Sequence, residues 1–232
     1  MESYYTLFVE LTIYINLFCI NLRDLRLPAE APRAGRRSTG NIYGLMIETQ
    51  KSLIHSLQSY STLFVEEEIF KSKFLELLEH PGSFYRDHLP GHITGSAWIV
   101  NEDLSKVLLV LHAKLGRWLQ PGGHADGDEN VLNVALREAK EETGLRNIQI
   151  LSPVIFDIDI HPIPARKDFP EHLHYDVRFL LQASERDLLA ISDESTDLKW
   201  FPVDELRALT GNAPSIMRMV GKTINLLNRS KQ

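Results

Sequence analysis

Residues 123–145, GHADGDENVLNVALREAKEETGL, combine an apolar helical stripe with a cluster of carboxylates. At about 100° per residue, the apolar residues of this segment fall on one side of a helix. They are Val131, Leu132, Ala135, Leu136 and Ala139. Three acidic residues, Glu138, Glu141 and Glu142, fall at the edge of that stripe. The segment therefore predicts a helix that packs on a sheet and presents three carboxylates at the rim of the contact.

The spacing of these glutamates predicts a divalent-metal site. Like charges at i, i+3 and i+4 weaken an isolated helix by a few tenths of a kcal/mol per pair, so a cation should lie nearby. Carboxylate oxygens favour Mg²⁺ or Mn²⁺, ions that also bind substrate phosphates. Before the helix, residues 121–124 (PGGH) predict a tight turn that could bring the backbone carbonyl of Gly123 to the metal. Gly144 suits the left-handed position that ends a helix.

This segment resembles the Nudix box, G-x5-E-x7-R-E-U-x-E-E-x-G-U, where U is a bulky apolar residue. The matching residues are Gly123, Glu129, Arg137, Glu138, Glu141, Glu142, Gly144 and Leu145. Ala139 departs from the pattern, because it is small where the first U stands. Residues 118–123 and 200–206 also look like segments that flank the box in Nudix hydrolases.

The resemblance implies an α/β/α sandwich with a mixed sheet, and hydrolysis of a pyrophosphate bond in a nucleotide. It also implies that Mg²⁺ or Mn²⁺ is held by Gly123, Glu138, Glu141 and Glu142. A carboxylate must orient or deprotonate the attacking water. Either a box glutamate or Glu194, which lies in an acidic stretch before Trp200, could take that role.

A second pattern places several histidines together. In residues 172–179, alternation along a strand puts His172, His174, Asp176 and Arg178 on one face. This polar face predicts a cleft in which His172 and His174 contact the substrate. The alternative is a transition-metal site made by His172, His174 and Asp176 and completed by His161 or His124. Three ligands on one strand would span about 13 Å, which disfavours that alternative.

Further substrate contacts are predicted in a loop and in the aromatic residues. The proline-rich residues 161–170 include Arg166 and Lys167, which could meet phosphate oxygens; an ordinary solvated loop is the alternative. Trp118 is the first candidate for stacking on a base, and Trp98 and Tyr175 are others. A place in the hydrophobic core is the alternative for all three.

Three parts are expected along the chain. Residues 1–45 hold an interrupted apolar stretch and a linker, which make a poor secretion signal and a short membrane span. They either lie upstream of a native start at Met46 or form a genuine extension or a weak membrane anchor. Residues 46–90 predict a helical hairpin, because apolar residues recur every three or four positions. Residues 91–232 predict the hydrolase domain.

Composition restricts the function further. A net charge of −6 argues against broad nucleic-acid binding, which normally uses a basic surface. The single cysteine, Cys19, excludes an internal disulfide and a cysteine-rich zinc site, so a reducing cytoplasm is expected. We expect a small-molecule nucleotide substrate and no stable membrane insertion, and the sequence leaves a homodimer open.

Two other functions share the expected fold. A nucleotide-sensing domain would have lost metal-binding glutamates, and all are present. An isoprenoid diphosphate isomerase would need a catalytic cysteine inside the domain, and Cys19 lies outside it. Among hydrolase substrates, a nucleoside diphosphate linked to another moiety, such as ADP-ribose, is preferred over a nucleoside triphosphate.

Overall fold

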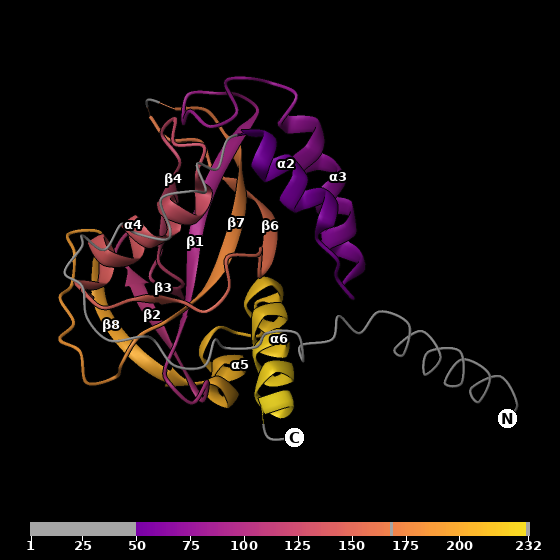
Figure 1. Ribbon diagram of the computed structural model, residues 1–232. Coiled ribbons are helices and arrows are strands. Elements are labelled where there is room, and N and C mark those ends of the chain that lie inside the picture. The colour runs from indigo at the N-terminus through magenta and orange to yellow at the C-terminus, as the bar shows by residue number, and fades with distance from the viewer. Residues whose placement is uncertain (1–49, 168, 231–232) are drawn as a thin grey trace, which may run out of the picture. The chain divides into compact units, whose positions relative to one another are not determined.

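A computed structural model describes residues 50–167 and 169–230 (Figure 1). The described residues belong to one compact unit. The expected extension at residues 1–45 lies outside the described residues. Within the described ranges, no helix is long and apolar enough to cross a membrane.

An eight-stranded mixed sheet forms the centre of this unit. Its strands are β1 (Gly91–Val100), β2 (Lys106–His112), β3 (Arg117–Leu119), β4 (Gly122–His124), β5 (Gln149–Ile150), β6 (Asp157–Ile163), β7 (His172–Gln182) and β8 (Ser195–Pro202). The main path runs β3-β2-β1-β7-β5, while β4 pairs with β1, β6 with β7 and β8 with β2. The long pair β1–β7 is parallel, and the other pairs are antiparallel.

Helices pack on this sheet through two hydrophobic clusters. The helical segments are α2 (Gln50–Ser59), α3 (Val65–Leu77), α4 (Val131–Thr143), the 3₁₀ turn η3 (Val203–Glu205), α5 (Leu206–Leu209) and α6 (Pro214–Ser230). In Figure 1, α4 lies beside β1 and β4, whereas α6, in yellow, lies near α5. Strand β1 serves both clusters, because Ile93, Ala97 and Ile99 pack with α4 while Trp98 and Val100 pack with α6. Successive side chains of a strand point to opposite faces, so the two clusters lie on opposite faces of β1 and give the expected α/β/α layers.

Most of the expected elements are confirmed, with one correction. The helices predicted within residues 46–90 are α2 and α3, and the strand predicted at residues 172–179 lies within β7. The tight turn predicted at residues 121–124 is wrong, because Gly122–His124 forms β4 and pairs with β1.

Helix α4 begins and ends as the sequence indicates. The Asn130 side chain caps its first turn by accepting a hydrogen bond from the Asn133 amide at 2.9 Å. Gly144 ends the helix with φ 71°, a left-handed conformation that glycine adopts without strain. The buried residues of the helix are Val131, Leu132, Val134, Ala135, Ala139 and Thr143. This stripe holds the helix on the sheet and leaves Glu138, Glu141 and Glu142 beside the contact.

Candidate functional site

Strand β4 and helix α4 meet so closely that a glycine is required between them. A Cβ atom built on Gly123 would lie 2.4 Å from the carboxyl carbon of Glu138, so the Glu138 carboxylate fills the place of the absent side chain. The neighbouring Gly122 amide donates a hydrogen bond to Oε1 of Glu142 at 3.2 Å. The glycines therefore serve a close approach of strand and helix, and they draw two of the predicted glutamates onto β4.

Arg137 ties the same helix to β4 from the other side. Its Nη1 lies 2.7 Å from Oε1 of Glu138 and 3.3 Å from Oε2 of Glu141. Its Nη2 donates to the His124 carbonyl at 3.0 Å. Arg137 thus orients two of the three box glutamates.

Burial and repulsion between carboxylates raise the pKa of two glutamates of this site. Burial, together with the nearby charges of Glu138, Glu194 and Glu141, raises the pKa of Glu142 to about 7, although the hydrogen bond from the Gly122 amide lowers it. Burial also raises the pKa of Glu138, against the opposing charge of Arg137. Glu194, whose carbonyl accepts the Ala113 amide at 2.9 Å just before β8, adds to both shifts. Four carboxylates named from the sequence are thus brought together, in an arrangement that a divalent cation would relieve.

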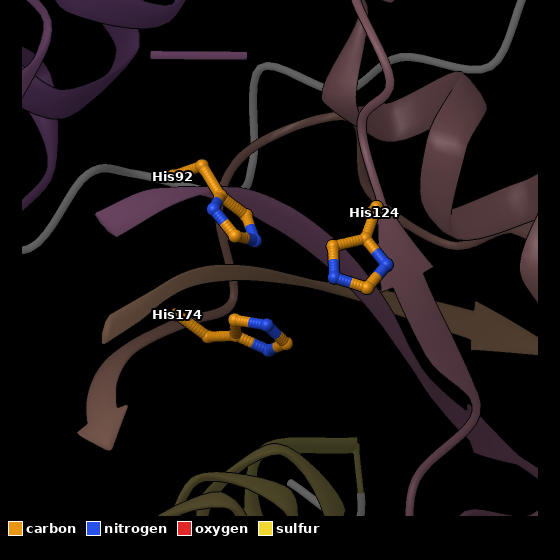
Figure 2. Close-up of side chains that lie close together, drawn as sticks. All are labelled: His92, His124 and His174. Atoms are coloured by element: carbon orange, nitrogen blue, oxygen red, sulfur yellow. The ribbon is translucent and has the colours of Figure 1, made fainter. Parts of the chain in front are cut away.

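The histidines gather on the neighbouring polar face of the sheet. Figure 2 shows the rings of His92, His124 and His174 turned toward one another from three strands. This convergence follows from the register, because His92 on β1 lies opposite His174 on β7, and Thr94 on β1 lies opposite His124 on β4. His172 stacks on His92 with a ring separation of 5.0 Å, and the His161 ring lies 5.5 Å from that of His174. His92 was not named from the sequence.

Asp176 and Arg178 belong to a different group of side chains. The Asp176 carboxylate accepts hydrogen bonds from Ser96 Oγ and Arg178 Nε, both at 2.7 Å. Arg178 also contacts Asp157 and Asp159 at 3.1 Å each and is buried. The polar face of β7 is therefore largely buried, and its Asp176 is engaged in an ion network beyond the histidines.

The remaining predicted contacts lie in two other places. Arg166 lines an open hollow of about 420 Å³ together with Lys114, Leu115, Pro164 and Ala165. Trp118 on β3 is partly buried against Phe201, with ring centroids 4.6 Å apart. Trp98 and Tyr175 are buried in the hydrophobic clusters, so a stacking role for these two is wrong.

Comparison with known proteins identifies a matching family and several relatives. The family model for the NUDIX domain matches residues 91–220. A CMP-5'-(N-acetyl-N-hydroxy-3-aminopropyl)phosphonate hydrolase of Streptomyces rubellomurinus is 28% identical over 176 residues, which cover 70% of this chain and 78% of the relative. A probable DHNTP pyrophosphohydrolase of Lactococcus lactis is 27% identical over 139 residues, covering 59% and 81%.

Among solved structures, a C. elegans Ap4A hydrolase binary complex is 18% identical and covers 59% of this chain and 98% of its own, with a TM-score of 0.49. The family match is independent of that likeness and extends from β1 into α6. Since it spans more than half of the 232 residues and includes the glycine and glutamates that meet between β4 and α4, the chain belongs to the NUDIX domain family.

Proposed function

We propose that this protein hydrolyses a phosphoanhydride bond in a nucleotide. The observation that carries the proposal is the group of four carboxylates, Glu138, Glu141, Glu142 and Glu194, around the close contact of Gly123 with α4. Hydrolysis of such a bond requires neutralisation of phosphoryl oxygens that gain charge, and a water aimed at the phosphorus. A group of carboxylates beside the backbone of a glycine-containing strand suits both requirements.

The residues of this carboxylate group fit Mg²⁺ or Mn²⁺. Glu138, Glu141, Glu142 and the Gly123 carbonyl would hold the ion, because hard oxygen ligands and mutually repelling carboxylates favour such cations. When bound, the ion supplies positive charge to the phosphoryl oxygens. Arg137 holds Glu138 and Glu141 in place, and the Gly122 amide orients Glu142.

Two carboxylates are candidates for the group that orients or deprotonates the attacking water. Glu142 is partly buried and accepts a hydrogen bond from the Gly122 amide, which orients its carboxylate. Glu194 is exposed on the loop before β8 and is close enough to add to the pKa shifts of Glu138 and Glu142. We propose that one of these two carboxylates orients the attacking water.

We propose substrate contacts at residues outside the carboxylate group. Arg166 and Lys114 place two cations at one hollow, where phosphate oxygens could be held. His172 lies at the start of β7, and Trp118 on β3 offers a partly buried ring. The net charge of −6 favours a small nucleotide over RNA.

The preferred substrate is a nucleoside diphosphate linked to another moiety, with nucleoside triphosphates second. The name of the Streptomyces relative describes a CMP group joined to a phosphonate, which supports the first class. The name of the Lactococcus relative, a probable DHNTP pyrophosphohydrolase, supports cleavage of a pyrophosphate bond but names no nucleoside.

A substrate panel with Mg²⁺ and with Mn²⁺ tests the function. We expect release of a nucleoside monophosphate from ADP-ribose-like compounds, and turnover at least 100-fold lower in Glu142→Gln and Glu138→Gln, because each change removes one charge from the ion site while keeping the side-chain shape. Glu79→Gln, an exposed change after α3, is the matched control and should match wild type. Nucleotide binding without turnover would indicate a sensor. Near-normal turnover in Glu142→Gln would show that the metal site is wrongly assigned.

A further inference from the structure

We propose that His92, His124 and His174 bind one divalent transition-metal ion of the zinc class, at a site separate from the carboxylates of α4. The three residues come from β1, β4 and β7, so the sheet itself positions them. Imidazole nitrogens suit Zn²⁺, Ni²⁺ and Cu²⁺, whereas carboxylate oxygens suit Mg²⁺. The two sites therefore differ in the ions they select.

The distances are short enough for one ion. One nitrogen from each ring can be chosen so that the three lie within 4.8 Å of one another (Figure 2). A tetrahedral Zn²⁺ with bonds of about 2.0–2.1 Å places its ligand nitrogens about 3.4 Å apart. Each pair therefore needs to close by at most about 1.5 Å, which rotation of imidazole rings can provide without moving the strands.

Two of the nitrogens are buried without a hydrogen-bond partner. His92 is 1% exposed, and its Nε2 has no partner among the described residues. Its Nδ1 lies 3.4 Å from the His88 carbonyl, and a proton donated there leaves the lone pair on Nε2. His174 Nε2 is likewise buried and unpartnered in the described part of the chain. Buried polar atoms are normally satisfied, so these two point to a ligand.

The surroundings keep the three rings neutral and in place. Burial lowers the pKa of His92, His124 and His174, and for His124 it falls to about 4. Metal binding requires neutral imidazole, so protons do not compete at neutral pH. The His172 ring stacks on His92, and Nδ1 of His172 lies 2.9 Å from the Pro170 carbonyl. These two contacts hold His172 beside the three rings.

The histidine site and the carboxylate group are joined by the peptide between Gly123 and His124. Gly123 receives the Glu138 carboxylate, and the next residue, His124, joins the histidines. Alternation along β4 turns these two positions to opposite faces of the strand. Three protein ligands leave the fourth tetrahedral position for a water or an anionic oxygen of a bound molecule.

The experiment measures metal content of the untagged full-length protein after exhaustive dialysis. We expect about one zinc per chain in wild type, and less than about a tenth of that in His92→Gln and His174→Gln, because three-histidine sites depend on each ligand. His55→Gln, the same change on the exposed face of α2, is the matched control and should keep the metal. Glu142→Gln should also keep it, which separates this site from the proposed hydrolase site whatever substrate assays show.

A second measurement uses wild type alone, in case the histidine variants fold poorly. After removal of metal by a chelator, addition of Zn²⁺ at a hundredfold excess over its dissociation constant should raise the melting temperature by about 5 to 10 °C. The rise should occur with saturating Mg²⁺ already present, because Mg²⁺ occupies the proposed carboxylate site and not the imidazoles. Added Co²⁺ should show the strong visible absorption of tetrahedral coordination. Metal-free wild type that binds neither Zn²⁺ nor Co²⁺, or a His92→Gln protein that retains stoichiometric zinc, overturns the proposal.

Discussion

Gly123 shows how a single missing side chain shapes the site. The space that its Cβ would occupy is filled by the Glu138 carboxylate, with 2.4 Å between the two carbon positions. Gly123→Ala should therefore displace Glu138 and lower turnover at least tenfold, with a weaker apparent affinity for Mg²⁺. Kinetics over a range of Mg²⁺ concentrations measure this change.

A matched glycine separates this effect from loss of stability. Gly221 lies inside α6, and its Cβ would meet nothing closer than the tip of Phe64 at 4.0 Å. Gly221→Ala should keep full activity and gain up to about 1 kcal/mol, since alanine favours a helix. Equal activity in the two alanine variants would contradict the proposed role of Gly123.

The raised pKa of Glu142 predicts how stability depends on pH. Its pKa is about 7 in the folded protein and 4.5 as the reference value, so the folded state binds more protons between those pH values. Without divalent metal, the free energy of unfolding should therefore fall as pH rises from 4.5 to 7. The part owed to Glu142 is on the order of 2 kcal/mol, less than the full shift because the carboxyl is partly exposed.

Chemical unfolding with a chelator present, at several pH values, tests that slope. Glu142→Gln removes the titrating group, so its curve should be flatter than that of wild type across the same window. Saturating Mg²⁺ should flatten the wild-type curve in the same way, because it favours the ionised carboxylate. Parallel curves for wild type and variant would show that Glu142 titrates normally.

Individual residues differed in how well the sequence predicted them. The close spacing of Glu138, Glu141 and Glu142 on one helix sufficed to predict their cluster, since helix geometry is local. His92 was missed because its neighbours in space are about 30 and 80 residues away in the chain. The alternation of His92, Thr94 and Ser96 with apolar residues in β1 was the available signal. It does not identify His92 as a partner of His174 until the β1–β7 pairing is known.

At the scale of elements, α6 is tied to β6 by a buried cation. The Arg218 side chain is 2% exposed and contacts Asp157 at 2.8 Å and Asp159 at 3.0 Å. Arg218→Met should lower the free energy of unfolding by about 3–5 kcal/mol, because it leaves buried carboxylates without this partner. Denaturant titration measures the loss, and Arg146→Met, at an exposed position, should change little.

A double variant tests whether charge, and not packing, is responsible. Asp159→Asn combined with Arg218→Met removes one of the stranded charges, so it should be more stable than Arg218→Met alone. If the free energy of unfolding of the double variant is lowered by the sum of the losses in Asp159→Asn and Arg218→Met, the two side chains do not form an ion pair of the proposed strength.

The elements themselves were largely predictable, whereas this network was not. Alternating and helical patterns predicted β7 and α4, because each has one clearly apolar face. The hairpin α2–α3 was assigned no chemistry, yet Glu67 of α3 is fully buried and contacts Lys222 of α6 at 2.6 Å. A glutamate that looks solvated in a helical pattern is identified as buried only once its distant partner is known.

For the whole molecule, the boundary expected between residues 46–90 and 91–232 stays a prediction, and the packing bears on how it should be tested. Leu57 of α2 and Phe74 of α3 belong to the same hydrophobic cluster as Ile93 of β1 and Val134 of α4. The Ile158 amide of β6 donates to the buried Glu67 carboxylate at 3.2 Å. The hairpin therefore supplies part of the core on which the catalytic sheet rests.

Two shortened chains test this organisation together. A chain beginning at Met46 should keep the melting temperature and the activity of the full chain if residues 1–45 contribute no core. A chain beginning at Gly91 should lose most of its cooperative unfolding, because removal of the hairpin exposes the Ile93 cluster and takes Glu67 from Lys222. Thermal unfolding and turnover distinguish the cases. A drop in the Met46 chain would show that residues 1–45 dock on the rest, whereas a fully stable Gly91 chain would make the hairpin a separate appendage.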